Sequence, residues 1–101
     1  MTEAVERKKA KKKTKKLLPP RDYKVILHND DYTPMEFVTW ILESIFHKNT
    51  PDAEYIMLDV HKKGKGVAGV YTFEIAEQKV VDTLEAAQEN QFPLQCSAEP
   101  V

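Results

Sequence analysis

The pattern of hydrophobic and polar positions predicts three strands and three helices after residue 20. The apolar runs at 23–27 and 67–73 are rich in β-branched and aromatic residues, as strands are, and 94–97 fits a short third strand. The stretches between these strands carry apolar residues three or four positions apart, which is the spacing of a helix. The predicted order is β-α-α-β-α-β. It indicates an α+β domain with three helices packed on a small three-stranded antiparallel sheet.

The first helix has strong start signals. Thr33 is expected at the cap and Pro34 at the first helical position, with Glu36 closing a capping box. The helix is expected to end at residues 48–49. The residues expected to face inward from it are Val38, Ile41, Leu42 and Ile45.

The second helix repeats this start, with Thr50 as the expected cap and Pro51 after it. Gly64 is expected to end it, because glycine readily adopts the left-handed conformation found after helices. The third helix is expected over 74–90. The inward residues expected from these two helices are Ala53, Ile56, Met57 and Val60, and then Ala76, Val80, Leu84 and Ala87.

Charge divides the chain into two parts. Residues 1–18 contain eight Lys or Arg and two Glu, whereas residues 19–101 contain seven Lys or Arg and fourteen Asp or Glu. The Lys-rich part has too few apolar side chains to offset the entropy lost on ordering. We therefore expect a flexible, disordered arm over 1–20 and one folded acidic domain over 21–101.

Composition also limits the cellular setting and the chemistry. No apolar run approaches the length of a membrane span, and the first residues are charged rather than apolar, so no secretory signal is expected. The single Cys96 excludes an internal disulfide. A cytoplasmic protein with no membrane partner is the expectation.

The Lys-rich arm raises a second function class, nucleic-acid binding by counterion release. Against it, the folded part is acidic and shows no aromatic platform for stacking bases. A solvated arm without a nucleic-acid partner is favoured. The series of glycines from Gly64 to Gly69 has dinucleotide-motif spacing, but it follows a helix and opens a strand, which is the reverse of that motif.

The most informative stretch is HNDDYTPMEF, which places Asn29, Asp30 and Asp31 between the first strand and the first helix. Asn and Asp are common in turns, where their side chains bond to nearby backbone amides. Two adjacent carboxylates repel each other, however, so a cationic partner would explain the pair. A metal held with His28 or His61 is an alternative, although no metal-ligand spacing supports it.

Three segments, VILHNDDYTPMEFV, MLDVHKKGKGVAGVYTFEIAEQKV and FPLQC, resemble the ClpS family in order and spacing. The resemblance covers about residues 21–98. It implies an adaptor rather than an enzyme, working without metal or cofactor. Such adaptors bind N-degron substrates that begin with Phe, Tyr, Trp or Leu and deliver them to the N-terminal domain of a ClpA-like Clp AAA+ unfoldase for degradation. We expect the adaptor to be a monomer when free.

The resemblance also implies site residues. Asn29, Asp31 and His61 match the residues that bind the substrate's α-amino group, and Asp30 matches the neighbouring acid, which has a lesser or supporting role. Of the two carboxylates, Asp31 is expected to contact the ammonium, while Asp30 either holds the turn or adds to the electric field. The residues matching the lining of the side-chain pocket are Leu27, His28, Thr33, Met35, Val38, Met57 and Leu94. Among them, Met35 matches the position that excludes β-branched first residues, and His28 stands where relatives often carry Leu or Val. The residues matching the unfoldase-docking surface are Glu74, Glu77 and Lys79.

The residue types suit this chemistry independently of the resemblance. A free α-amino group has a pKa near 8, so at pH 7 it is mostly an ammonium with three N–H donors. An Asn carbonyl, a carboxylate and a neutral imidazole nitrogen supply one acceptor each. The same side chains would discriminate against an acetylated or internal residue, because their polar groups would remain unpaired.

Overall fold

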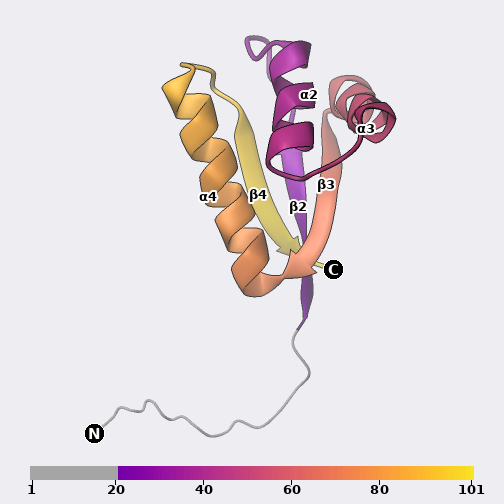
Figure 1. Ribbon diagram of the computed structural model, residues 1–101, viewed down its shortest axis with the longest axis vertical. Coiled ribbons are helices and arrows are strands. Elements are labelled where there is room, and N and C mark those ends of the chain that lie inside the picture. The colour runs from indigo at the N-terminus through magenta and orange to yellow at the C-terminus, as the bar shows by residue number, and fades with distance from the viewer. Residues whose placement is uncertain (1–20) are drawn as a thin grey trace, which may run out of the picture.

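The computed structural model describes residues 21–101, and the predicted basic arm over 1–20 lies outside the described residues. The predicted order of strands and helices is confirmed (Figure 1). The elements are β2 Asp22–His28, α2 Met35–Ser44, α3 Thr50–Lys63, β3 Lys65–Thr72, α4 Phe73–Glu89 and β4 Gln95–Pro100.

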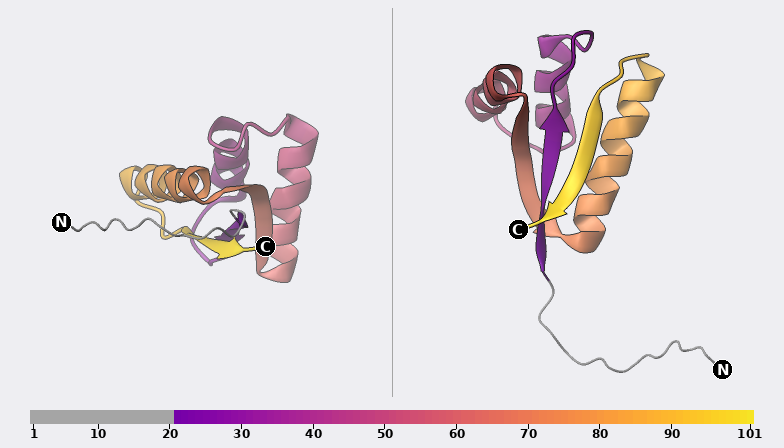
Figure 2. Two further views of the ribbon diagram at one scale, coloured as in Figure 1. Left: turned by 90° about the horizontal axis from the view of Figure 1, so that it is seen from below. Right: turned by 180° about the vertical axis from the view of Figure 1, so that it is seen from behind.

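The three strands form one antiparallel sheet in the order β3-β2-β4, so β2 is central and pairs with both neighbours. The helices cover one face of the sheet and leave the other open, as the view from behind in Figure 2 shows. Successive side chains of a strand point to opposite faces. On β2, Val25 and Leu27 are fully buried in the core beneath the helices. The side chains of Ile26 and His28 therefore point to the open face.

The β2–β3 pairing contains one irregularity. Val25 pairs with Gly69 and Ile26 with Val67, which leaves Ala68 as an extra residue on β3. Ala68 is fully buried. A bulge of this type increases the local twist of the strand.

One hydrophobic core joins the sheet to all three helices. Its fully buried members include Leu27 on β2 and Ile41 on α2. The predicted inward face of α4 is wrong at one position, because Leu84 is 36% exposed and the neighbouring Thr83 is buried instead. All three buried residues of this helix are small, since Ala76 and Ala87 are the other two.

Cys96 on β4 is a buried free thiol. Burial raises the pKa of Cys96 to about 12, and the nearby Thr83 hydroxyl opposes this rise only in part. The Thr83 oxygen makes no hydrogen bond of ordinary geometry with any described residue. Cys96 therefore stays a neutral thiol at physiological pH and packs as a small apolar side chain.

The predicted caps of α2 and α3 are wrong in detail. Pro34 occupies the N-cap of α2 in an extended conformation, and no side chain caps this helix, so Thr33 and Glu36 do not form the expected box. Asn49 caps α3, and its side-chain oxygen accepts a hydrogen bond of 2.9 Å from the backbone N–H of Asp52. The hydroxyl of Thr50 instead donates to Glu43 across the α2–α3 connection, at 2.8 Å.

Some element ends also differ from the sequence pattern. Helix α2 ends at Ser44, earlier than the expected 48–49, because the chain turns at His47, whose φ is +56°. Strand β4 extends to Pro100 rather than stopping at 97, since Glu99 and Pro100 continue the ladder with β2.

Gly64 ends α3, as predicted. A second glycine, Gly66, sets how closely this helix approaches the sheet. Gly64 is left-handed, with φ of +90°, and its N–H bonds to the Val60 carbonyl. A side chain at Gly66 would lie 2.9 Å from a methyl carbon of Val60. Glycine therefore lets the start of β3 pack directly against the last turns of α3.

Candidate functional site

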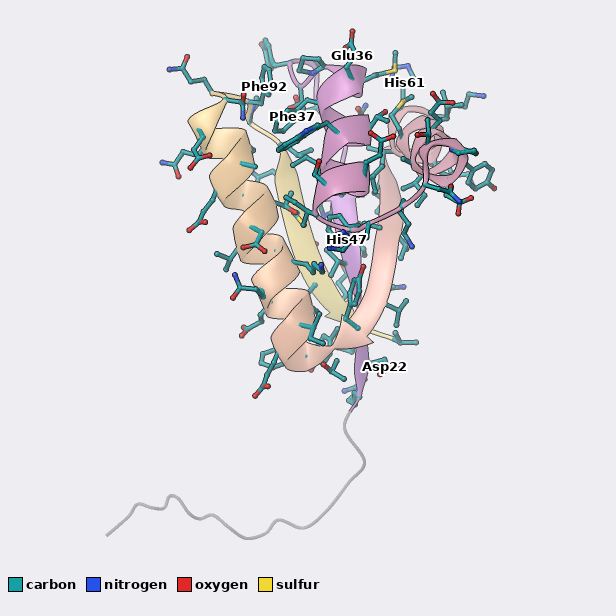
Figure 3. The ribbon with its side chains drawn as sticks, in the orientation of Figure 1. Asp22, Glu36, Phe37, His47, His61 and Phe92 are labelled. Atoms are coloured by element: carbon teal, nitrogen blue, oxygen red, sulfur yellow. The ribbon has the colours of Figure 1, made fainter. Side chains whose placement is uncertain are left out.

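Three segments meet at one end of the domain: the turn after β2, the start of α2 and the last turn of α3. The backbone N–H of Asn29 donates to the carbonyl of Gly64 at 2.9 Å, which ties the turn to the end of α3. Figure 3 shows the consequence, with Glu36 on α2 and His61 on α3 at the same end of the molecule. Residues far apart in sequence are thereby brought to one place.

Asp30 holds the turn together. Its Oδ1 accepts hydrogen bonds from the backbone N–H groups of Tyr32 and Thr33 at 2.8 and 2.7 Å, and its Oδ2 accepts one from the Thr33 hydroxyl at 2.8 Å. Burial acts to raise the pKa of Asp30, but the bonds from Thr33 and Tyr32 outweigh it and leave the pKa lowered. Both carboxylate oxygens are therefore used within the turn.

We predict that Asp30→Asn lowers stability in a pH-dependent way. At neutral pH the free energy of unfolding of the variant is expected to be about 1 kcal/mol lower, because hydrogen bonds to a charged acceptor are lost. The folded-state pKa lies below the unperturbed value of 3.8, so the stabilisation is present above that pH and disappears as the pH falls through the lower folded-state value. Urea unfolding of both proteins at pH 7 and pH 3 measures this. An equal difference at the two pH values would contradict it.

A hollow of about 240 Å³ opens beside this turn. One wall is polar and comes from the turn and from α3, and the other is apolar and comes from α2 and α3. The residues that line it are Asn29, Asp30, Asp31, Thr33, Met35, Val38, Met57, Val60 and His61.

The polar wall presents acceptors that have no partners in the part of the chain that the structure describes. Asp31 and His61 are exposed, and neither their side chains nor that of Asn29 makes a hydrogen bond or ion pair with a residue of 21–101. An amide oxygen, a carboxylate and an imidazole nitrogen can together accept three hydrogen bonds. This set fits a ligand that has several N–H donors and a positive charge.

The apolar wall is formed by Met35, Val38, Met57 and Val60. Met35 is 46% exposed at the first position of α2, so it stands at the rim. Methionine is flexible and polarizable, and it adapts to aromatic and aliphatic groups alike. Val60 is the lining residue that the expected pocket lacked. Its position one turn after Met57 on the same helix face is the signal that could have found it.

Three residues expected in the pocket do not line the hollow. Leu27 and Leu94 are almost fully buried and belong to the same core cluster as Val38. His28 points to the open face of the sheet because it alternates with Leu27. Its Nε2 lies 2.9 Å from the Ser97 hydroxyl on β4.

The expected docking residues on α4 lie on two faces of that helix. Glu74 and Glu77 are three positions apart and line a groove of about 490 Å³ that also contains Phe73, Gln78, Val80, Val81 and Ala98. Lys79 faces the other side. Its ammonium donates to the Ile45 carbonyl at 2.6 Å, beyond the end of α2, and lies 5.7 Å from the centre of the Tyr71 ring.

Two further observations bear on alternative functions. Within residues 21–101, no group of three or more His, Cys, Asp or Glu side chains is arranged to hold a metal ion. None of the described helices is both long and apolar enough to cross a membrane.

Fold and hollow together define a small binding domain, with an acceptor-rich corner next to an apolar pocket. Comparison with known sequences then identifies the family. The profile of the ATP-dependent Clp protease adaptor protein ClpS matches residues 18–97. The chain belongs to the ClpS family, which is a family of adaptor proteins and not of known enzymes.

Individual relatives support this assignment. The ATP-dependent Clp protease adapter protein ClpS of Desulfatibacillum aliphaticivorans is 55% identical over 87 residues, covering 86% of this chain and 84% of the relative. The ClpS of Rhodospirillum centenum is 55% identical over 91 residues, covering 90% and 82%. Among solved structures, Agrobacterium tumefaciens ClpS2 bound to L-phenylalaninamide is 38% identical, with a TM-score of 0.80 over 82% of this chain and 100% of that chain.

Proposed function

We propose that this adaptor binds the N-terminal residue of N-degron substrates in the hollow between the β2–α2 turn, α2 and α3. The observation that carries the proposal is that the acceptors of Asn29, Asp31 and His61, which have no partner within residues 21–101, lie directly beside an apolar wall. The ligand of Agrobacterium tumefaciens ClpS2, L-phenylalaninamide, has both complementary parts, a free α-amino group and an aromatic side chain.

The α-amino group is assigned to the polar wall. Its three N–H donors at neutral pH match the three acceptors, and charge-assisted hydrogen bonds contribute about 1.5–3 kcal/mol each. Asp31 is the carboxylate assigned to the ammonium, because both oxygens of Asp30 are already bonded within the turn. Asp30 therefore acts indirectly, by fixing the backbone on which Asn29 and Asp31 stand.

The first side chain is assigned to the apolar wall. Phe, Tyr, Trp and Leu gain about 1.5–3 kcal/mol on leaving water. Met35 at the rim narrows the entrance and is assigned to exclude side chains that branch at Cβ. Together the two subsites give a binding free energy of about -8 kcal/mol, which corresponds to a dissociation constant in the micromolar range or below. Binding of this strength permits release of the substrate.

Delivery to a Clp unfoldase is assigned to α4. The groove along Glu74 and Glu77 is flanked by exposed Phe73 and Val81, so it offers a partner both charge and apolar area. Lys79 is assigned a supporting role, since its ammonium is engaged with Ile45 and Tyr71. We propose that the partner is the N-terminal domain of a ClpA-like unfoldase, met in the cytoplasm by a monomeric adaptor.

Direct binding of peptides tests the proposal. A fluorescent peptide beginning with Phe and a free amine is expected to bind at micromolar concentration or better and to be displaced by L-phenylalaninamide. The same peptide beginning with Ala is expected to bind roughly 10- to 100-fold more weakly, because the apolar wall loses its contact. Fluorescence polarisation measures both. Equal affinity for the Phe and Ala peptides would refute the assigned pocket.

A further inference from the structure

A second groove adjoins the hollow on the outer surface between α2 and α3. It has a volume of about 480 Å³, and its lining includes Trp40 of α2. Met35 and Met57 line both this groove and the hollow, so the two lie side by side at the surface. A peptide whose first residue occupies the hollow can therefore extend its following residues into the groove.

The rim of this groove is acidic. Glu36 and Glu43 on α2 and Glu54 on α3 line it, and no Lys, Arg or His is among its lining residues. None of the three carboxylates is in an ion pair with a residue in the described part of the chain. Glu43 accepts a hydrogen bond of 2.8 Å from the Thr50 hydroxyl, which orients it across the α2–α3 connection.

Trp40 gives the groove an aromatic surface. Its indole is 48% exposed and lies against Phe37, with ring centres 5.7 Å apart and planes inclined by 27°. Phe37 in turn packs on Phe92 at 4.8 Å, between α2 and the α4–β4 connection (Figure 3). This support holds an exposed aromatic ring in place beside three carboxylates. Such a ring attracts Lys and Arg side chains through cation–π contacts.

We propose that this groove binds the residues that follow the first residue of the substrate, and that it selects segments carrying Lys or Arg at about the third to fifth positions. The inference rests on the proposed function of the hollow. An extended peptide advances about 3.3–3.6 Å per residue, so the residue after the first leads out of the hollow and the next ones meet the rim. The Glu side chains then attract the basic groups, and Trp40 contacts their alkyl and charged parts.

Peptides of matched sequence test the proposal. Each begins with Phe-Ala and has either two Lys, two Gln or two Glu at the third and fourth positions. At low salt the Lys peptide is expected to bind about fivefold tighter than the Gln peptide, and the Glu peptide about fivefold weaker, as expected for exposed charge pairs. At about 300 mM salt the differences shrink.

A double variant, Glu43→Gln with Glu54→Gln, separates the groove from the acidic turn. Asp30 and Asp31 also attract basic peptides, and they remain in this variant. The preference for Lys over Gln is expected to fall from about fivefold to below about twofold, while affinity for the Gln peptide stays unchanged. Glu85→Gln on α4, which removes an exposed charge elsewhere, is expected to keep the full preference. A preference that survives in the double variant overturns the proposal.

Trp40 provides an independent readout because it is the single tryptophan of the chain. Saturating Lys peptide is expected to reduce quenching of its fluorescence by acrylamide at least twofold. L-Phenylalaninamide, which has no following residues, is expected to leave the quenching nearly unchanged. If L-phenylalaninamide binds but the peptides show no charge preference and no protection of Trp40, the inference about the groove is wrong and the proposed function stands. If L-phenylalaninamide itself does not bind, the proposed function fails.

Discussion

Acetylation of the α-amino group is expected to weaken binding of a Phe-starting peptide by at least about 100-fold. The acetyl group removes the positive charge and two of the three N–H donors, so the oxygens of Asn29 and Asp31 and the ring nitrogen of His61 would lose their partners. A polar group that the bound peptide covers but does not hydrogen-bond costs about 1–3 kcal/mol, and more when it is charged. Competition by free and acetylated peptides against one labelled peptide measures the ratio.

Asp31→Asn tests the proposal that Asp31 is the carboxylate that binds the ammonium. The variant is expected to bind the free-amine peptide about 30-fold more weakly than the unmodified protein, because an amide replaces the charged acceptor. Its affinity for the acetylated peptide should hardly change, since that peptide has no charge to lose. Stability should stay within about 0.5 kcal/mol, because Asp31 makes no hydrogen bond with another described residue.

Two outcomes would contradict the amine assignment. The first is equal affinity for free and acetylated peptides. The second is a loss in Asp31→Asn that is the same for both peptides, which would indicate a damaged turn rather than a lost ammonium contact. Glu85→Gln, an exposed acid on α4, serves as the charge-matched control and should bind like the unmodified protein.

Leu27→Ala is expected to destabilise the domain by about 3 kcal/mol and lower Tm by more than about 10 °C. Leu27 is fully buried on the central strand and belongs to the core cluster. Truncating such a residue loses transfer free energy and leaves a cavity that the surrounding core fills only in part. Thermal unfolding followed by circular dichroism gives the shift.

The same variant shows whether Leu27 acts through the core or through the pocket. At a temperature where Leu27→Ala remains folded, its affinity for a Phe-starting peptide should fall less than about threefold. Met57→Ala is the matched comparison, because Met57 lines the hollow and is only half-buried. That variant should lose about 10-fold in affinity with a smaller loss of stability. A tenfold loss in folded Leu27→Ala would place Leu27 in the pocket after all.

Local signals in the sequence correctly predicted those features of the fold that depend on only one or two residues. Gly64 ends α3 because it can adopt a left-handed conformation, and the structure has it there. Capping was harder to predict, because several polar residues compete for the same backbone amides. Asn49, rather than Thr50, caps α3, and Thr33 bonds to Asp30 instead of capping α2.

The face of α4 shows the limit of periodicity. Leu84 and Thr83 are adjacent, and helical spacing alone favoured the larger apolar residue. In the structure Thr83 is buried and Leu84 is exposed. Only the distance between the packed elements decides between such neighbours.

By itself the sequence determined the order of strands and helices, the family, and the residue types of an amine-binding corner, because these depend on local spacing and chemistry. The tertiary structure decided which residues from distant segments of the chain come into contact. It joined Asn29 to the end of α3 near His61, and it placed Met35 of α2 and Met57 of α3 along one hollow. It also turned His28 to the open face of the sheet. The reason is physical: such contacts depend on strand register and on the packing distance between elements, which no short stretch of sequence specifies.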